Sequence, residues 1–405
     1  MKVLDVTEFY SERGGGVRSH LTTKGHVLCQ LGHDHVVIAP GAKDDSAGAT
    51  HDLASGPGSA RVIRVAGPAS PYDPSYHLLL NTSKIRDLIA AEKPDVLEIH
   101  SPYMAAVGAL RARRGTYGIR TFQWHSDFID TYGGVLEDKA PFLPRAAITT
   151  ATYPLWSLVR SIARRCDATL VASAWQVGKL AAHGVPNVVH RPFGIEHETF
   201  STKRASDEGR RALLDLTGRE SAFVCVGIGR FAIEKRWDLV IDAFRAFRSK
   251  GHDDAVLVLF GDGPERKRMQ ERAGDAPVFM PGFSKDRVEL ATHLANADML
   301  VHGCPFETFG LSIAEAMSCG LPAVVPDDGG ANEMHDPESG ERYAANDAAS
   351  CSEAMLRLFD RISLNTRGLR TSASRAASRL PSIFDHFSEQ LGLYERLLAS
   401  RREAK

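Results

Sequence analysis

Short apolar runs alternate with longer, helically periodic stretches along all 405 residues, and this alternation most restricts the fold. Residues 256–260, Val-Leu-Val-Leu-Phe, are apolar at consecutive positions, as in parallel strands covered on both faces. The alternation predicts βα units, parallel sheets and the α/β fold class. We expect strands over residues 2–7, 35–39, 61–65, 96–100, 120–124, 169–172, 222–227, 256–260, 278–280, 299–302 and 323–325.

The length and one change in composition predict two domains. A chain of 405 residues is long enough for two hydrophobic cores. A polar, charged stretch over residues 201–211 follows the last strand of the first half. We therefore expect domains over residues 1–195 and 196–380, with a loop and a helix start over 339–352. The tail, residues 381–405, predicts one amphipathic helix, because Phe387, Leu391 and Tyr394 recur at helical spacing.

The bulk properties exclude several classes of protein. The formal net charge is −1, so nothing draws the whole chain to nucleic acid. No apolar run approaches the length of a membrane span, and acidic residues come too early for a secretory signal. The six cysteines form no C-x-x-C pair, which favours reduced core thiols over a zinc site. These features predict a cytoplasmic protein.

Two glutamates eight positions apart form the main candidate site. Glu307 lies in a loop after the strand predicted at 299–302, and Gly310 opens a helix that carries Glu315. The free N–H groups of a helix start can bind phosphate. A carboxylate one turn further along could bind the hydroxyls of a ribose, and the loop carboxylate could reach a sugar. Glutamates at this spacing also occur by chance on capped surface helices.

The residues around this pair resemble glycosyltransferase family 4, the retaining nucleotide-sugar transferases with the GT-B fold. The resemblance rests on the order E-x7-E, Phe309-Gly310-Leu311 and Gly320-Leu321-Pro322. Upstream, residues 223–235 match a phosphate-binding segment, and residues 258–264 and 279–283 match the segments that follow it. The resemblance implies two Rossmann-like domains whose parallel sheets face each other across a cleft, an acceptor domain first and a donor domain second. It also implies that the last helix crosses back to the first domain.

The resemblance assigns roles to residues in both halves. It implies retention of anomeric configuration, with Glu307 on the sugar hydroxyls and Glu315 on the ribose. The residues that it places at catalysis are His125, Glu307, Arg230 and Lys235. The residues that it places at the donor are Gly15, Gly16, Gly229, Phe283, Phe309, Gly310, Leu311 and Glu315.

Arg230 and Lys235 suit the chemistry of the leaving group. Negative charge grows on the β-phosphate as the anomeric bond breaks, and cations or backbone donors must stabilise it. Arginine can bind two phosphate oxygens, and lysine acts as a point charge. The chain contains no D-x-D pair to hold a divalent metal. We therefore expect transfer without a metal or other cofactor.

Two segments of the first half are further candidates. The turn over residues 10–17 is rich in glycine but is not G-x-G-x-x-G, which argues against a Rossmann dinucleotide site. It resembles the N-terminal glycine loop of the family, which implies that its backbone approaches the donor phosphate or the acceptor; a flexible turn is the alternative. His125 ends a predicted strand, where side chains face the ligand crevice of open α/β sheets. Asp127 could orient His125, contact the acceptor or cap the next helix.

The acceptor is the least constrained part of the prediction. Arginines gather in the first half, and apolar residues 153–159 precede some of them; this pattern fits an anionic membrane surface or, equally, a core helix with a solvated face. We expect a lipid acceptor and peripheral contact with the inner membrane face. A saccharide or a small soluble alcohol is the alternative acceptor. A nucleotide-sugar-binding protein without turnover, an epimerase and a phosphorylase are the alternative classes. The arginines are Arg111, Arg113, Arg114, Arg120, Arg160, Arg164 and Arg165.

Overall fold

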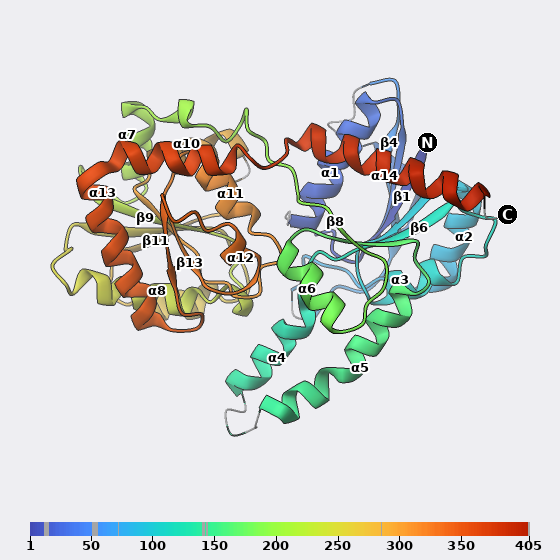
Figure 1. The fold of residues 1–405 in the computed structure, drawn as a ribbon, viewed down its shortest axis with the longest axis horizontal. Helices are drawn as coiled ribbons and strands as arrows, with labels where there is room; N and C mark the ends of the chain where they lie inside the picture. The colour runs from blue at the N-terminus through green and yellow to red at the C-terminus, as the bar shows by residue number, and fades with distance from the viewer. Residues whose placement is uncertain are drawn as a thin grey trace. The chain divides into compact units, whose positions relative to one another are not determined.

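The computed structural model describes residues 1–11, 16–50, 56–71, 73–139, 142, 145–284 and 286–403. The chain divides into two compact units (Figure 1). Unit 1 comprises Met1–Pro192 and Ile383–Lys405, and unit 2 comprises Phe193–Ser382. Each unit is built of a largely or wholly parallel sheet with helices, so the predicted α/β class is confirmed.

Unit 1 contains an eight-stranded sheet of order β3-β4-β2-β1-β5-β6-β7-β8. Only β3 is antiparallel to its neighbour. The six strands predicted for this half are present, and β3 and β8 were not predicted. Both are edge strands, and β8 has only three residues, none of them fully buried, so neither produces an apolar run. The bounds are β1 Lys2–Val6, β2 Asp34–Gly41, β3 Asp45–Thr50, β4 Ala60–Ala66, β5 Val96–Ile99, β6 Ile119–Gln123, β7 Ala168–Val171 and β8 Val188–His190.

Seven helices accompany this sheet in the described ranges. Figure 1 shows α4 and α5 side by side, extending away from the sheet. Among the helices of the described ranges in both units, none combines the length and apolar character that crossing a bilayer requires. The bounds are α1 Gly16–Gln30, α2 Thr82–Glu92, α3 Met104–Leu110, α4 Phe128–Lys139, α5 Arg145–Ala163, α6 Ala174–Ala182 and α14 Ile383–Glu403.

Unit 2 contains a six-stranded parallel sheet of order β11-β10-β9-β12-β13-β14. The side chains of β10 alternate between two cores, with Val256 and Val258 in one and Leu257 and Leu259 in the other. The prediction that this strand is covered on both faces is therefore confirmed. The bounds are β9 Phe223–Ile228, β10 Ala255–Phe260, β11 Val278–Gly282, β12 Met299–Val301, β13 Ala323–Pro326 and β14 Gly340–Tyr343.

One prediction for unit 2 is wrong. We expected a loop over the residues before the helix start near 348, but Gly340–Tyr343 forms β14, which pairs in parallel with β13. Arg342 is exposed and the half-buried Glu341 binds Arg357 and Arg361 of the following helix, so the strand lacks an apolar pattern. The helices of unit 2 are α7 Asp207–Asp215, α8 Trp237–Arg248, α9 Arg266–Ala273, α10 Arg287–Asn296, α11 Leu311–Ser318, α12 Gly329–Glu333 and α13 Ala348–Ala377, with short 3-10 turns at Thr202–Arg204 and Ile233–Lys235.

The C-terminal helix α14 belongs to unit 1, although unit 2 precedes it in the chain. Its apolar face buries Phe387, Leu391 and Tyr394 in one cluster with Val3 and Ile119 of the sheet. The predicted return of the last helix to the first domain is therefore confirmed. Burying these side chains offsets the entropy lost when the tail is ordered.

We expect Phe387→Ala to destabilise unit 1 by about 3–5 kcal/mol, because it leaves a cavity under α14. Phe387 is 2% exposed, whereas Phe384 on the same helix is 49% exposed. Phe384→Ala is the matched control and should change stability by less than about 0.5 kcal/mol. Urea unfolding followed by circular dichroism measures both. Equal effects of the two substitutions would contradict the packing described.

Candidate active site

The E-x7-E segment lies at the carboxyl end of β12. Glu307 is in the loop that follows β12, and Glu315 lies in the second turn of α11. Gly310 precedes the first residue of α11 with φ +95°. A Cβ at Gly310 would also meet the Met334 side chain at 3.0 Å, so the left-handed turn into the helix requires glycine. The predicted loop–helix arrangement of the two glutamates is present.

Lys235 and Glu307 form an ion pair. The Lys235 Nζ atom lies 2.6 Å from Glu307 Oε2, and His302 Nε2 lies 3.3 Å from the same oxygen. Burial would raise the pKa of Glu307, but the Lys235 charge and His302 outweigh it and hold that pKa well below its usual range. Burial would lower the pKa of Lys235, and Glu307 raises it instead. Both groups are therefore charged at neutral pH.

The loop that carries Arg230 is held by close backbone contacts. The Phe260 carbonyl accepts from the Gly229 amide at 3.0 Å, and Trp237 Nε1 donates to the Arg230 carbonyl at 3.0 Å. A Cβ on Gly261 would lie 1.9 Å from the Gly229 oxygen. The glycine-rich turn after β10 therefore packs directly beneath the predicted phosphate loop, which explains the need for glycine there.

Glu315 has a partner that sequence reasoning missed. Arg287, the first residue of α10, places Nη2 2.7 Å from Glu315 Oε1 and Nε 2.9 Å from Glu196 Oε1. Burial raises the pKa of Glu315, and Arg287 opposes that rise. Arg287 lies in none of the motifs named above, so the sequence contained no signal of its contact with Glu315.

The other predicted donor residues differ in accessibility. The Phe309 ring is buried and lies edge-on to Phe193, with ring centroids 5.5 Å apart. Leu311 is half-buried, and Phe283, just after β11, is 55% exposed. The Phe283 side chain is therefore accessible to solvent, whereas Phe309 contributes packing. These residues, like Gly229, follow the carboxyl ends of strands in unit 2.

His125 lies in unit 1, after the carboxyl end of β6. Its Nε2 atom is 2.6 Å from Nδ1 of His100. Burial, and then the charges of His100 and Lys24, hold the pKa of His125 well below its usual range, so the ring is neutral. Gly16 is the first residue of α1, and Gly15 lies outside the described residues.

The carboxylate of Asp127 is bound by Lys179, which also binds Asp130. Burial raises the pKa of Asp127 to about 6, despite Lys179. The backbone oxygen of Asp127, and not its carboxylate, accepts from the Thr131 amide in the first turn of α4. The Asp130 amide, in the first turn of α4, also acts on the Asp127 carboxylate and lowers its pKa, which fits the predicted helix cap. The roles of Asp127 toward His125 and the acceptor stay predictions, and Lys179 adds an ion pair.

The arginine-rich region of the first half separates into core and surface. Trp156 and Val159 are buried, and Trp156 stacks on Trp124 with ring centroids 6.0 Å apart. Arg120 is also buried, where it donates to the carbonyls of Ala109 and Arg165, so it does not belong to a surface cluster. The exposed arginines are Arg111, Arg113, Arg114, Arg164 and Arg165.

Two groups of side chains in the described residues have the composition of a metal site. One comprises His302, Cys304 and Glu307, and the other comprises Asp5, Glu98 and His100. In each group a lysine ammonium already binds the carboxylates, Lys235 in the first and Lys24 in the second. Burial also raises the pKa of Cys304 to about 12, which disfavours the thiolate that metals bind. We therefore interpret both groups as buried ion pairs.

Comparison with known proteins identifies the family. Residues 14–198 match the model described as Glycosyltransferase Family 4, and residues 216–368 match Glycosyl transferases group 1. A GDP-mannose-dependent alpha-(1-6)-phosphatidylinositol dimannoside mannosyltransferase of Mycobacterium tuberculosis (strain ATCC 25177 / H37Ra) is 30% identical over 342 residues, which cover 84% of this chain and 83% of that protein. A GDP-mannose-dependent alpha-mannosyltransferase of Corynebacterium glutamicum is 28% identical over 331 residues, 82% of this chain and 73% of that protein.

Solved structures agree on the fold. Sucrose-phosphate synthase (tll1590) from Thermosynechococcus elongatus superposes with a TM-score of 0.77 at 18% sequence identity, covering 98% of this chain and 99% of that chain. The strand order and the return of α14 to unit 1 fit the same architecture. The chain therefore belongs to glycosyltransferase family 4 and is a retaining nucleotide-sugar glycosyltransferase with the GT-B fold.

Proposed function

We propose that this enzyme transfers mannose from GDP-mannose to a hydroxyl of a membrane glycolipid. The observation that carries the proposal is the similarity, over more than four-fifths of the chain, to a GDP-mannose-dependent phosphatidylinositol dimannoside mannosyltransferase. A second relative is also a GDP-mannose-dependent mannosyltransferase. The donor residues of unit 2 supply the chemistry that such a transfer needs.

In this proposal Lys235 neutralises the donor diphosphate. An ammonium group has three N–H donors, and Glu307 engages one of them. The other two donate to phosphate oxygens, together with the Arg230 guanidinium and the backbone of Gly229. Because these groups are held before the donor arrives, they stabilise the charge that develops on the β-phosphate with little reorganisation.

The two glutamates orient the sugar and the nucleoside. Glu307 accepts hydrogen bonds from mannose hydroxyls while Lys235 keeps it ionised. Glu315 accepts hydrogen bonds from the ribose hydroxyls while it keeps its ion pair with Arg287. The departing phosphate takes the proton of the attacking hydroxyl on the same face of the sugar, which retains configuration. His125 hydrogen-bonds a sugar or phosphate oxygen.

Surface side chains of α5 support a lipid acceptor. Tyr153 and Leu158 are exposed on α5, and Phe142, between α4 and α5, is 82% exposed. Arg164 and Arg165 follow the helix and are also exposed. Apolar and cationic side chains together bind anionic bilayers peripherally. We therefore place the acceptor reaction at an anionic membrane face.

We expect GDP-mannose to raise the melting temperature more than UDP-glucose or ADP-glucose at equal concentration, because the tighter ligand stabilises the folded state more. Incubation with GDP-mannose should then mannosylate phosphatidylinositol mannosides, detected by mass spectrometry, with unchanged yield in excess chelator. Transfer only to soluble saccharides would overturn the lipid acceptor. Binding without transfer or donor hydrolysis would indicate a binding protein.

We expect Lys235→Ala and Glu307→Ala to lower kcat by about 10²–10³-fold, because each removes a fixed charge at the reacting groups. Lys250→Ala and Glu353→Ala remove exposed charges of the same kind in unit 2 and are the matched controls. Steady-state kinetics with GDP-mannose, with circular dichroism as a check of folding, measures the effect. Full activity in either site variant would refute the assigned roles.

We expect the protein to float with vesicles that contain anionic phospholipid and not with neutral vesicles, and added salt should weaken the binding. The triple variant Phe142→Ser, Tyr153→Ser, Leu158→Ser should reduce flotation at least about fivefold, because it removes the exposed apolar side chains. Leu364→Ser is the control, because Leu364 is 87% exposed on α13 of unit 2. Equal flotation of both variants would exclude the α4–α5 region as the contact.

A further inference from the structure

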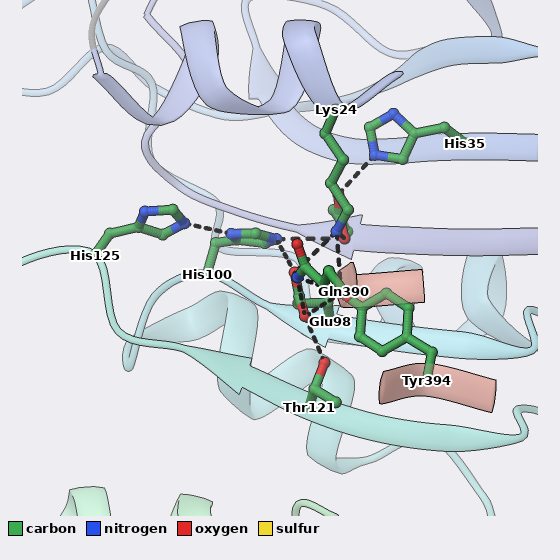
Figure 2. A network of polar contacts seen from close by, with 9 residues as sticks. Lys24, His35, Glu98, His100, Thr121, His125, Gln390 and Tyr394 are labelled. Carbon is green, nitrogen blue, oxygen red and sulfur yellow. Dashed lines mark hydrogen bonds and ion pairs between the residues drawn. The ribbon is translucent and has the colours of Figure 1, made fainter. Parts of the chain in front are cut away.

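The interior of unit 1 contains a charged cluster that none of the proposed steps uses. Asp5 of β1, Lys24 of α1 and Glu98 of β5 are completely buried. Lys24 Nζ lies 2.9 Å from Asp5 Oδ1. It also lies 2.8 Å from Glu98 Oε1 (Figure 2). Two carboxylates and one ammonium carry a net charge of −1. An uncompensated charge at such depth costs several kcal/mol, so a further cation is required.

Both carboxylates are ionised. Glu98 Oε2 accepts from Thr121 Oγ1 at 2.7 Å and from the Tyr394 hydroxyl of α14 at 2.6 Å (Figure 2). Burial would raise the pKa of Glu98, but Lys24 and His100 lower it overall. Burial would likewise raise the pKa of Asp5, and Lys24, His100 and His35 hold it well below its usual range.

His100 lies between this cluster and His125. Its Nε2 atom is 3.3 Å from Asp5 Oδ1 and 3.4 Å from Glu98 Oε1, so Nε2 must carry a proton. Its Nδ1 atom is 2.6 Å from Nε2 of His125. The two rings lie end to end, with centroids 4.8 Å apart and 23° between their planes (Figure 2). One proton lies between the two rings, and the question is which ring it belongs to.

The other titratable groups around the cluster do not supply the missing cation. His35 Nε2 contacts Asp5 at 2.6 Å, and burial lowers the pKa of His35. Burial also lowers the pKa of His20, of His125 and, to about 4, of His386. Tyr394 stays neutral, because burial raises its pKa. His100 faces both carboxylates, so the two negative charges stabilise a positive charge on its ring more than on any of these other groups.

We propose that His100 is a buried imidazolium that fixes the protonation of His125. His100 donates its Nδ1 proton to Nε2 of His125, which therefore accepts and carries its own proton on Nδ1. His125 is then a neutral ring with an N–H donor at Nδ1. The formal charges of the four side chains then add to zero, so no uncompensated charge is left in the low-dielectric interior. The four are Asp5, Glu98, Lys24 and His100. No covalent step is involved.

The functional meaning of this arrangement rests on the proposed sugar transfer. A donor at Nδ1 suits an oxygen acceptor, either a sugar hydroxyl or a phosphate oxygen, and a bare nitrogen would suit only a hydroxyl proton. His100 is a positioning residue, because it acts on substrate through His125. The C-terminal helix takes part indirectly, since Tyr394 of α14 holds Glu98. The tail that returns to unit 1 thereby contributes to the state of the site histidine.

Nuclear magnetic resonance tests the protonation directly. We expect two-bond proton–nitrogen correlation spectra of 15N-histidine-labelled protein at neutral pH to show both nitrogens of His100 protonated. His125 should show a protonated Nδ1 and a bare Nε2. Spectra of His100→Gln and His125→Gln assign the signals. A His125 protonated on Nε2, or a His100 with one proton, would overturn the proposal.

A substitution that keeps both histidines in the chain provides the second test. Glu98→Gln removes one negative charge, so Asp5 and Lys24 balance each other and His100 becomes neutral. His125 should then shift its proton to Nε2, and kcat for GDP-mannose should fall about tenfold with KM nearly unchanged, as expected for one misdirected hydrogen bond. Thr121→Val is the matched control, because it removes one bond to Glu98 without changing charge.

The outcomes separate this proposal from the proposed function. Thr121→Val should keep the wild-type tautomer and a kcat within about twofold of wild type. An unchanged His125 tautomer in folded Glu98→Gln would overturn the charge argument. A shift of the His125 proton to Nε2 in Thr121→Val would also overturn it. If Glu98→Gln does not fold, the wild-type spectra decide alone. They need no substrate, so failure of GDP-mannose turnover would count against the function and leave this result standing.

Discussion

Both units of this enzyme contain buried carboxylates that are bound by cationic side chains, and the need to place these charges together constrains each unit. An ionised carboxylate in a protein interior costs several kcal/mol unless a partner of opposite charge lies at contact distance. In unit 2 Lys235 compensates Glu307, and in unit 1 Lys24 binds both Asp5 and Glu98 and compensates one of their two negative charges. In each pair the cation and the carboxylate come from different segments of the chain, so the fold must bring the two segments together. The sheets supply that precision, because they fix where each strand ends.

The same constraint would let the proposed site bind a diphosphate with little rearrangement. Lys235 and Glu307 hold each other in their charged forms, so the lysine presents remaining N–H groups and the glutamate presents lone pairs. Glu315 is bound by Arg287, which also binds Glu196 in the segment that begins unit 2, but burial still raises the pKa of Glu315. A ligand that binds here meets groups already charged and oriented. Preorganised charges and donors of this kind are usually the largest single contribution of an enzyme to transition-state stabilisation.

Glycines complete the arrangement by allowing backbone segments to touch. Gly310 adopts a left-handed conformation that admits the turn into α11, and Gly261 lets the turn after β10 reach the backbone of Gly229. Neither residue contributes chemistry of its own. They matter because a side chain at either position would separate the loops that carry Arg230 and Glu307 from their supports. The motif residues and the glycines therefore form one structural unit.

The sequence by itself determined the α/β class, the buried strands such as β10, the loop–helix placement of Glu307 and Glu315, and the family. These follow from periodicity, local turn chemistry and motif order, which act over a few residues. Only the tertiary structure decided that edge strands β3, β8 and β14 exist, that Arg120 and Trp156 are buried, and that Arg287 binds Glu315. It also brought together Lys24, Glu98, His100 and Tyr394, of which Glu98 and Tyr394 are 296 positions apart. Local pattern cannot reveal such pairs, because the free energy that selects them arises when distant segments exclude water together.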